Sequence, residues 1–437
     1  MNKKTENKAV SPWQWVPSLY FAQGIPYVVV MSVAVILFKR MGMSNTDIAL
    51  YTSGLNLPWV IKPLWSPLVD LLKTKRWWIV VMQILVGAGL AGIALTIQGP
   101  LAFRYCLAFM WLLAFSSATH DIAADGFYML GLNEKKQAYF VGIRNTFYRF
   151  AVIFGQGILV MFAGWLEQRY AREMPETAAI PQAWSLTFYL LTILFALLFV
   201  YHYLFLPHPR RDTCTLPPQQ ASAGRVFKEF LGTFTSFFQK KHIVSALIFI
   251  LLYRFAEAQL VKITSPFLLD TPATGGLALS TAEVGFIYGT IGVIALTIGG
   301  IVGGIAMARR GLKSCLWTMT IAMNLPNIVY LYLSFARPES IGIISGCVAI
   351  EQFGYGFGFT SLTYFMMLFS NGKHQTAHYA ICTGFMALGL MLPGMISGWI
   401  EESIGYRAFF VWIMLCTIPS FWATHLVRKN LTDNHSD

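Results

Sequence analysis

The chain has 437 residues, of which 56% are apolar and only 12% are charged. The apolar residues recur in runs of about 20, the length of helix that crosses a bilayer, and leave no large soluble domain over. The net charge of +12 does not require nucleic acid as a partner, because the basic residues lie between the apolar runs, where they can contact anionic lipid headgroups. Composition therefore predicts a multi-pass helical membrane protein.

Apolar runs separated by charged breaks predict about twelve spans, at roughly 13–38, 47–69, 77–97, 101–124, 138–165, 185–206, 243–268, 282–307, 314–335, 340–369, 379–400 and 406–427. The first run is too long for a signal-peptide core and lacks a small-residue cleavage site, so we interpret it as an uncleaved span. An even number of spans places both termini on one side. Lys and Arg are concentrated in the segments on that side, so the positive-inside rule predicts cytoplasmic termini.

The longest polar break, at 207–242, divides the spans six and six. We therefore expect an all-α fold of two six-helix bundles, residues 1–206 and 243–437, joined by a cytoplasmic linker at 207–242. A short internal repeat supports this division: the fifth span ends Gly164-Trp165-Leu166-Glu167, and the eleventh ends Gly398-Trp399-Ile400-Glu401. These are equivalent positions in a repeat of six plus six spans.

Several motifs of soluble enzymes and ATPases do not occur in the sequence. It has no Gly-x-x-x-x-Gly-Lys-Ser/Thr phosphate loop, no His-Glu-x-x-His and no Gly-x-Ser-x-Gly, and its cysteines are not at metal-ligand spacing. We expect no enzyme activity, no cofactor and no metal. ATP-driven transport within this chain is excluded, so any transport would draw its energy from a gradient.

Charged residues inside the apolar runs are the main functional signal. A charge in a membrane span is costly unless it faces a polar cavity or a partner, so by default it marks a pathway. The residues concerned are Lys62, Asp121, Asp125, Arg149, Arg254, Glu257, Lys262 and Glu351.

In the fourth span, Asp121 and Asp125 are four residues apart and share one helix face. Their repulsion in a low dielectric would favour protonation of at least one, which makes them proton-coupling candidates. Alternatively, both lie near the cytoplasmic mouth, where they are solvated or paired with Arg144 or Arg149.

Polar residues on the second and fifth spans are expected to line a cavity. Asn145, Arg149 and Gln156 fall on one face of the fifth span. Arg149 would bind an anionic substrate group or neutralise Asp121, and both interpretations stay open. In the second span, Lys62 follows Trp59 by three residues, so the two offer a cation and an aromatic surface on one side, unless Trp59 only packs.

The seventh and tenth spans carry the other candidates. Tyr253 and Arg254 are expected to bind substrate, and Glu257 to couple protons, although Arg254 and Glu257 could form a purely structural ion pair. Glu351 lies inside the tenth span without a cationic neighbour in sequence, which is typical of a protonated or functional carboxylate. Tyr355 shares its helix face and is a further substrate candidate.

Six segments, in this order along the chain, resemble the AmpG-type muropeptide permeases, which form part of the peptide/acetyl-coenzyme A transporter branch of the major facilitator superfamily. The segments are Phe21-Ala22-Gln23-Gly24-Ile25-Pro26, Lys62-Pro63-Leu64-Trp65-Ser66-Pro67-Leu68-Val69-Asp70, Ala118-Thr119-His120-Asp121 with Asp125, Tyr148-Arg149, Leu252-Tyr253-Arg254 with Glu257, and Glu351 before its glycines. Of the superfamily's motif between the second and third spans, only Asp70, Lys75 and Arg76 are kept, and we assign these to gating.

The resemblance implies proton-coupled import of peptidoglycan fragments, from periplasm to cytoplasm, across the bacterial inner membrane. We expect the transporter to be a monomer. The fragments are anhydromuropeptides, in which N-acetylglucosamine is joined to 1,6-anhydro-N-acetylmuramic acid with or without peptide. Transport of other amino sugars or oligosaccharides, proton-driven export of amphiphilic compounds, and a sensor that does not transport remain alternatives. Glu257, where the family often has Asp, and Arg254, in place of Lys, are positions where substrate choice could differ.

Overall fold

The structure is a computed structural model that describes residues 10–209, 212, 232, 234–371 and 375–433. The helices of the first half, up to Phe205, are α1 (Pro12–Val28), η1 (Val29–Val33), α2 (Ala34–Arg40), α3 (Asn45–Gly54), α4 (Leu57–Leu72), α5 (Lys75–Thr96), α6 (Ala102–Gly131), α7 (Glu134–Val152), η2 (Ile153–Ile158), α8 (Leu159–Tyr170) and α9 (Glu176–Phe205). Those of the second half are α11 (Ile243–Leu252), α12 (Phe255–Leu269), α13 (Thr281–Val284), η3 (Gly285–Gly292), α14 (Val293–Asn324), η4 (Leu325–Asn327), α15 (Ile328–Ala336), α16 (Ile341–Phe369), α17 (Gln375–Leu415) and α18 (Ile418–Asp433).

Each of the twelve expected spans coincides with a helix or with abutting helical segments. Length and hydropathy alone mark eight candidate spans among the described residues. Two of these eight each contain two helices, so the eight together account for ten of the twelve expected spans. α14 is interrupted at Gly311 and α17 at Gly405, where φ is 72° and 75°. The chain reverses at Gly311: Cys315 Sγ lies 3.5 Å from the carbonyl oxygen of Ala306, whereas nine residues of straight helix would span about 13 Å.

The two remaining spans fall short of these criteria for local reasons. The second span is divided between α3 and α4, neither of which is long enough to cross a bilayer alone. α16 has sufficient length, but Glu351 and Gln352 lie within it and lower its hydropathy. Both segments therefore cross the membrane as parts of the fold, although their apolar character is weaker than that of their neighbours.

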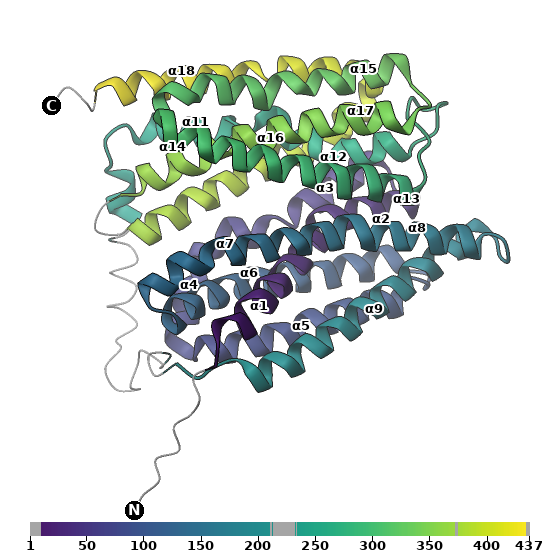
Figure 1. Cartoon of the computed structure of the whole chain (residues 1–437). Helices are drawn as coiled ribbons and strands as arrows, with labels where there is room; N and C mark the ends of the chain where they lie inside the picture. Colours follow the sequence, from purple (N-terminus) through teal and green to yellow (C-terminus); the bar gives the residue numbers. More distant parts are fainter. Residues whose placement is uncertain (1–9, 210–211, 213–231, 233, 372–374, 434–437) are drawn as a thin grey trace, which may run out of the picture.

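The helices of the two halves form two layers, the first half below and the second above in Figure 1. α1 begins and α18 ends on the same side of the molecule, which we call the terminal side, and we call the opposite side the far side. α3 extends out of its layer and lies against α17 of the second half. The domain boundaries at 207–242 stay a prediction, because most of that segment lies outside the described residues.

The apolar core shows that the halves are joined unequally. One cluster of buried residues contains Phe38 and Trp184 of the first half together with Phe267 and Phe409 of the second. Two further clusters each belong to a single half, one around Phe249 in the second half and one around residues 15–20 and 122–128 in the first. The halves therefore share a core on the far side and keep separate cores on the terminal side.

Candidate functional site

Asp121 on α6 is held by two side chains of α4. Its Oδ2 accepts a hydrogen bond from Trp59 Nε1 at 3.0 Å, and Lys62 Nζ lies 3.6 Å away. Because Trp59 and Lys62 are three residues apart, one face of α4 presents both of them to Asp121. The Lys62 side chain is 28% exposed and that of Asp121 13%, so the pair lies inside the protein but is still accessible.

Asp125, one turn nearer the terminal side, has different partners. Its Oδ1 accepts a hydrogen bond from Tyr20 OH at 3.1 Å and lies 3.4 Å from Arg144 Nη1. The Arg144 guanidinium also stacks over the Tyr20 ring, 4.9 Å from its centroid. The sequence offered Arg144 or Arg149 as partners of the two aspartates. The structure pairs Asp125 with Arg144, whereas Asp121 is paired with Lys62.

Arg149 on α7 is an unpaired cation. It is partly buried, and it forms no ion pair or hydrogen bond within the described part of the chain. It interacts electrostatically with Tyr27 and Tyr148 of its own half and with Tyr355 of the second half. A guanidinium that is free and faces the other half is suited to bind an anionic group of a substrate.

Arg254 lies at a break between α11 and α12, with φ −108° and ψ 23°. Its guanidinium donates a hydrogen bond to Tyr355 OH and lies 5.0 Å from the centroids of the Tyr355 and Phe359 rings. The ion pair with Glu257 that the spacing allowed is not formed among the described residues, because the helix does not continue regularly through Arg254. α16 holds this cation instead.

Two carboxylates of the second half are buried without a full set of hydrogen-bond donors. Glu351 is 1% exposed; its Oε2 accepts from Tyr330 OH at 3.1 Å and from Gln352 Nε2 at 2.9 Å, while its Oε1 has no partner among the described residues. Glu257 is 3% exposed, and its Oε2 also lacks a donor there. The two carboxylates interact electrostatically, with Arg254 as the nearby cation.

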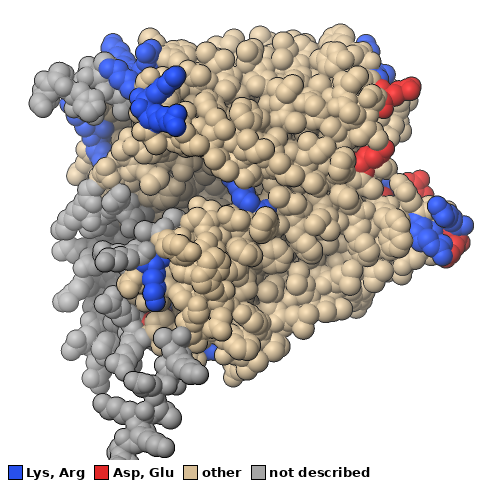
Figure 2. Space-filling model, in the orientation of Figure 1, with Lys and Arg blue, Asp and Glu red and all other residues tan. Residues whose placement is uncertain are grey.

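The groups of both halves meet around Tyr27 of α1. The Tyr27 ring packs edge to face with Trp59 at 5.3 Å between centroids. Tyr27 also interacts electrostatically with Asp121 and Arg149 of the first half and with Arg254 of the second. Figure 2 shows a hollow between the two layers with basic atoms in it. The central site, as we call it, consists of Tyr27, Trp59, Lys62, Asp121, Arg149, Arg254, Glu257 and Glu351.

Three further substrate-binding candidates, Tyr253, Gln156 and Asn145, have surroundings that differ from those expected from the sequence. Tyr253 is fully buried in the core between α11 and α16, where its hydroxyl donates to the Gly358 carbonyl oxygen at 3.0 Å. Gln156 lies in the π-helical turn η2, whose wider winding interrupts the polar stripe, and its backbone carbonyl packs against Gly289 of the second half. Asn145 is exposed on α7. The structure therefore does not group Tyr253 with the central site.

Lys75 and Arg76, two of the residues assigned to gating, contact the end of the first half and the start of the 207–242 segment. The backbone N–H groups of Lys75 and Arg76 donate to the Asp212 carboxylate at 2.7 and 3.0 Å. The Arg76 guanidinium also donates to backbone carbonyls at the end of α9. These bonds tie α5 to the end of α9. The side chain of Asp70, on α4, lies outside the described residues, and the gating role of all three stays a prediction.

A polar network joins the two halves on the far side. Lys39 Nζ lies 2.7 Å from Asp270 Oδ1, and Asn45 Nδ2 donates to Glu401 Oε2 at 2.6 Å and to Tyr406 OH at 2.8 Å. Tyr406 OH in turn donates to Asp270 Oδ2 at 2.6 Å. Because Lys39 and Asn45 belong to the first half and the other three to the second, these bonds hold the far side closed.

The repeated Gly-Trp-x-Glu segments occupy matching places in this closure. A Cβ at Gly164 would collide with the backbone at the start of α13, and one at Gly398 with the backbone at the start of α3. Glu167 accepts a hydrogen bond from Thr281 Oγ1 at 2.7 Å, as Glu401 does from α3. Each half thus contributes one close-packed glycine and one hydrogen-bonded glutamate to the other half.

Sequence reasoning missed Tyr27 and Tyr330. Tyr27 follows Gln23 by four residues on α1, and Gln23 lies beside Asp121, so a polar stripe on the first span was available as a signal. Tyr330 had no such signal, because it meets Glu351 only through the packing of two helices. Among the described residues, no group of His, Cys, Asp and Glu is arranged to hold a metal ion.

The fold and this arrangement of charges define a transporter, and comparison with known proteins identifies its family. A model of the Major Facilitator Superfamily matches residues 18–377, so the chain belongs to that superfamily. It is 25% identical to a Rickettsia felis transporter named AmpG 4 over 427 residues, which cover 94% of this chain and 95% of the relative. It is 24% identical to the anhydromuropeptide permease of Escherichia coli K12 over 420 residues, which cover 94% and 79%.

Solved structures share the fold at lower identity. A nucleoside transporter superimposes with a TM-score of 0.68 at 15% identity, covering 95% of this chain and 98% of that one. A D-xylose-proton symporter superimposes with a TM-score of 0.65 at 12% identity, covering 94% and 95%. The chain is therefore a multi-pass membrane transporter and not an enzyme, and over most of its length it is similar to AmpG-type permeases.

Proposed function

We propose that this transporter imports anhydromuropeptides across a bacterial inner membrane and couples their entry to protons. Two relatives that match nearly the whole chain carry the names AmpG and anhydromuropeptide permease. Protons are the only coupling ion in this proposal, and no cofactor is involved.

The observation that carries the proposal is the meeting of cations, carboxylates and aromatic rings at the central site. Anhydromuropeptides combine sugar rings with carboxylate groups. Arg149 is free to bind a carboxylate, and Lys62 is accessible beside its partner Asp121. Tyr27 and Trp59 offer flat surfaces for sugar rings. Groups from both halves are in reach, so substrate binding can respond to movement of one half against the other.

Glu257 and Glu351 are the proposed proton carriers. Both are buried, and each has an oxygen without a donor. A charged carboxylate is costly in such a place, so a proton taken up there reduces the cost and can be released when the surroundings become polar. Because Glu257 interacts with both Glu351 and Arg254, protonation of one carboxylate changes how strongly Arg254 attracts a substrate anion.

The cycle we propose is alternating access by rocking of the two halves. The far side is closed by the shared core and the polar network, while the terminal-side cores are separate. With the termini in the cytoplasm, as the positive-inside rule predicts, this state faces the cytoplasm and is the one that releases substrate. The far side would open to the periplasm to load it.

Uptake of labelled anhydromuropeptide into right-side-out membrane vesicles tests this function. We expect accumulation when an inward proton gradient is imposed, and none beyond equilibration when the gradient is collapsed. An empty-vector membrane provides the background. If inserted protein gives no accumulation of this substrate while it accumulates another amino sugar or exports the compound from everted vesicles, the substrate or the direction of the proposal is wrong.

A further inference from the structure

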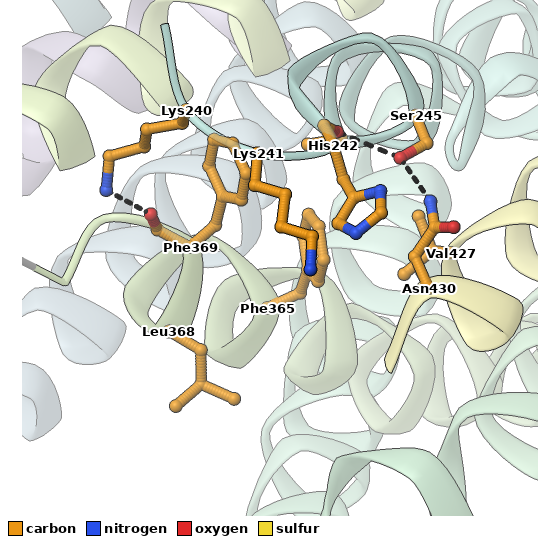
Figure 3. Close-up of a pocket in the computed structure, with 10 residues that line it drawn as sticks. Lys240, Lys241, His242, Ser245, Phe365, Leu368, Phe369, Val427 and Asn430 are labelled. Carbon is orange, nitrogen blue, oxygen red and sulfur yellow. Dashed lines mark hydrogen bonds between the residues drawn. The ribbon is translucent and has the colours of Figure 1, made fainter. Parts of the chain in front are cut away.

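The second half contains a basic cavity that the central site does not include. It lies on the terminal side, between the segment that leads into α11 and the ends of α16 and α18, and its volume is about 290 Å³ (Figure 3). Lys240, Lys241 and His242 form one wall, and Phe365 and Phe369 of α16 form another. No Asp or Glu is among the described residues that line it.

The two lysines of this cavity differ in their hydrogen bonding. Lys240 Nζ donates to the backbone carbonyls of Phe369 and Asn371 at 2.6 and 2.8 Å, so it holds the end of α16 in place. Partial burial lowers the pKa of Lys240, which means that a nearby anion would stabilise its charge. Lys241 is exposed and makes no hydrogen bond or ion pair in the described part of the chain. It is free to bind a ligand.

His242 adds a donor to the same wall. It precedes α11 in the left-handed backbone region, with φ 61°, a conformation that is uncommon for a residue other than glycine. Its Nε2 is enclosed and has no hydrogen-bond partner among the described residues. The positive end of the α11 dipole points to the same place. Two ammonium groups, an imidazole and the start of a helix therefore surround a space that has no acidic side chain among its described lining residues.

We propose that this cavity binds the phosphate group of an anionic phospholipid from the adjacent leaflet, with Lys241 and His242 contacting the phosphate. The apolar wall favours a lipid over a free anion, since Phe365 and Phe369 would contact the glycerol and acyl region. The opening also lies at the membrane boundary: Leu368 is 40% exposed and Val244 67%. Basic pockets between helices on the cytoplasmic side suit lipid headgroups. The proposal does not depend on which solute is transported.

Lipid binding to the purified full chain tests this assignment. Native mass spectrometry would compare phosphatidylglycerol with phosphatidylcholine of the same acyl chains, and we expect at least tenfold tighter retention of the anionic lipid, as two cationic contacts would give. Lys241→Ala should weaken phosphatidylglycerol binding about fivefold, the contribution of one cation at a membrane surface. His242→Gly should also weaken it, and glycine tolerates the left-handed backbone, so the fold is kept.

The controls separate this site from general charge effects and from free phosphate. Lys313→Ala removes an exposed lysine on the same side but outside the cavity, and it should leave binding unchanged. Inorganic phosphate at millimolar concentration should not displace the lipid, because it lacks the apolar part. Equal binding of the two lipids, an equal loss in Lys313→Ala and Lys241→Ala, or displacement by inorganic phosphate would each overturn the proposal.

Discussion

The four acidic candidates of the apolar runs differ in their surroundings, and the roles we propose for them follow from these differences. Asp121 has a cation at 3.6 Å and an indole donor, and Asp125 has an arginine and a tyrosine. Both are compensated. Glu257 and Glu351 have incomplete donor sets and only one cation nearby. The first pair is therefore suited to hold the site in shape, and the second to take up and release a proton.

Glu351→Gln should remove the proton dependence of transport. The amide oxygen can still accept the hydrogen bond from Tyr330, so the fold should be kept and exchange of internal for external substrate should continue. With an inward gradient of one pH unit, accumulation should fall about tenfold, the ratio that one coupled proton supplies. Glu173→Gln, in an exposed loop, is the matched control. Accumulation as high as in the parent protein would contradict the role of Glu351.

Lys62 and Asp121 should behave as a coupled pair. Lys62→Met leaves the Asp121 carboxylate inside the protein without its cation and with only the neutral side chains of Trp59 and Gln23 beside it, so it should raise the KM for uptake more than the double variant Lys62→Met/Asp121→Asn does. We expect a coupling energy of about 1 kcal/mol, or about fivefold in KM. A double-mutant cycle on uptake kinetics measures it. Strictly additive effects of the two substitutions would show that the contact contributes nothing to binding.

The charged residues that lie at the central site could be predicted from the sequence, but the side chains that they contact could not. A charge inside an apolar run is visible in the sequence, and each charge at the central site was found in this way. The contact of Lys62 with Asp121 or of Tyr330 with Glu351 depends on helix packing that no spacing rule describes. For Tyr253, the sequence did not indicate that the side chain is buried. Its neighbour Arg254 faces the central site, while Tyr253 itself is packed in the core.

At the scale of elements, glycines and π-helical turns determine how closely the halves approach. η2 of the first half packs on η3 of the second, where a Cβ at Gly289 would overlap the carbonyl of Gln156. α8 meets α13 at Gly164, and α17 meets α3 at Gly398. Such contacts allow backbone-to-backbone packing across the seam, which larger side chains would prevent.

Gly398→Val should open the far side. The added side chain would collide with the start of α3, and overpacking of this kind costs about 1–3 kcal/mol. If only the closed state bears that cost, the ratio of the far-side-open to the closed state rises roughly five- to 150-fold. Ser53→Cys, buried against α17, would report it through faster labelling by a membrane-impermeant thiol reagent added outside. Gly304→Val, where nothing lies nearby, is the control. Equal labelling in both variants would contradict this account.

The number and order of the spans were predictable because each apolar run has the length of a membrane helix. The interruptions within them were not. The π-helical turn at 153–158 and the break at Arg254 leave no mark on hydropathy, yet they determine where Gln156 and Arg254 lie. The Gly-Trp-x-Glu repeat did predict a correspondence between two spans, and the structure gives both copies the same kind of contact.

At the scale of the whole molecule, the two halves contact each other mainly on the far side, so the structure represents the state in which the far side is closed. Within the described part of the chain, the halves share a buried apolar core and a polar network on the far side but not on the terminal side. Acidic side chains on the face in Figure 2 lie mainly on the far side. In the proposed cycle these contacts between the halves break and re-form each time a substrate passes, so a permanent link across them should stop transport.

Bridging Thr46→Cys to Glu402→Cys should therefore abolish transport reversibly. The two side chains are hydrogen-bonded across the halves, so a short bis-methanethiosulfonate, which joins each cysteine through a reducible disulfide, can span them in the closed state. Uptake should fall to background after bridging and return on reduction. The pair Arg169→Cys and Glu173→Cys, within one half, controls for the reagent. Unchanged uptake in a fully bridged protein would show that the far side does not need to open.

Proton movement with substrate is the most direct test of the central claim that the buried carboxylates of the second half couple import to protons. In proteoliposomes without an imposed gradient, adding anhydromuropeptide outside should raise the external pH as protons enter with it. Glu351→Gln should still equilibrate the substrate but give no pH change. Substrate entry in the parent protein without any change of external pH would contradict the account.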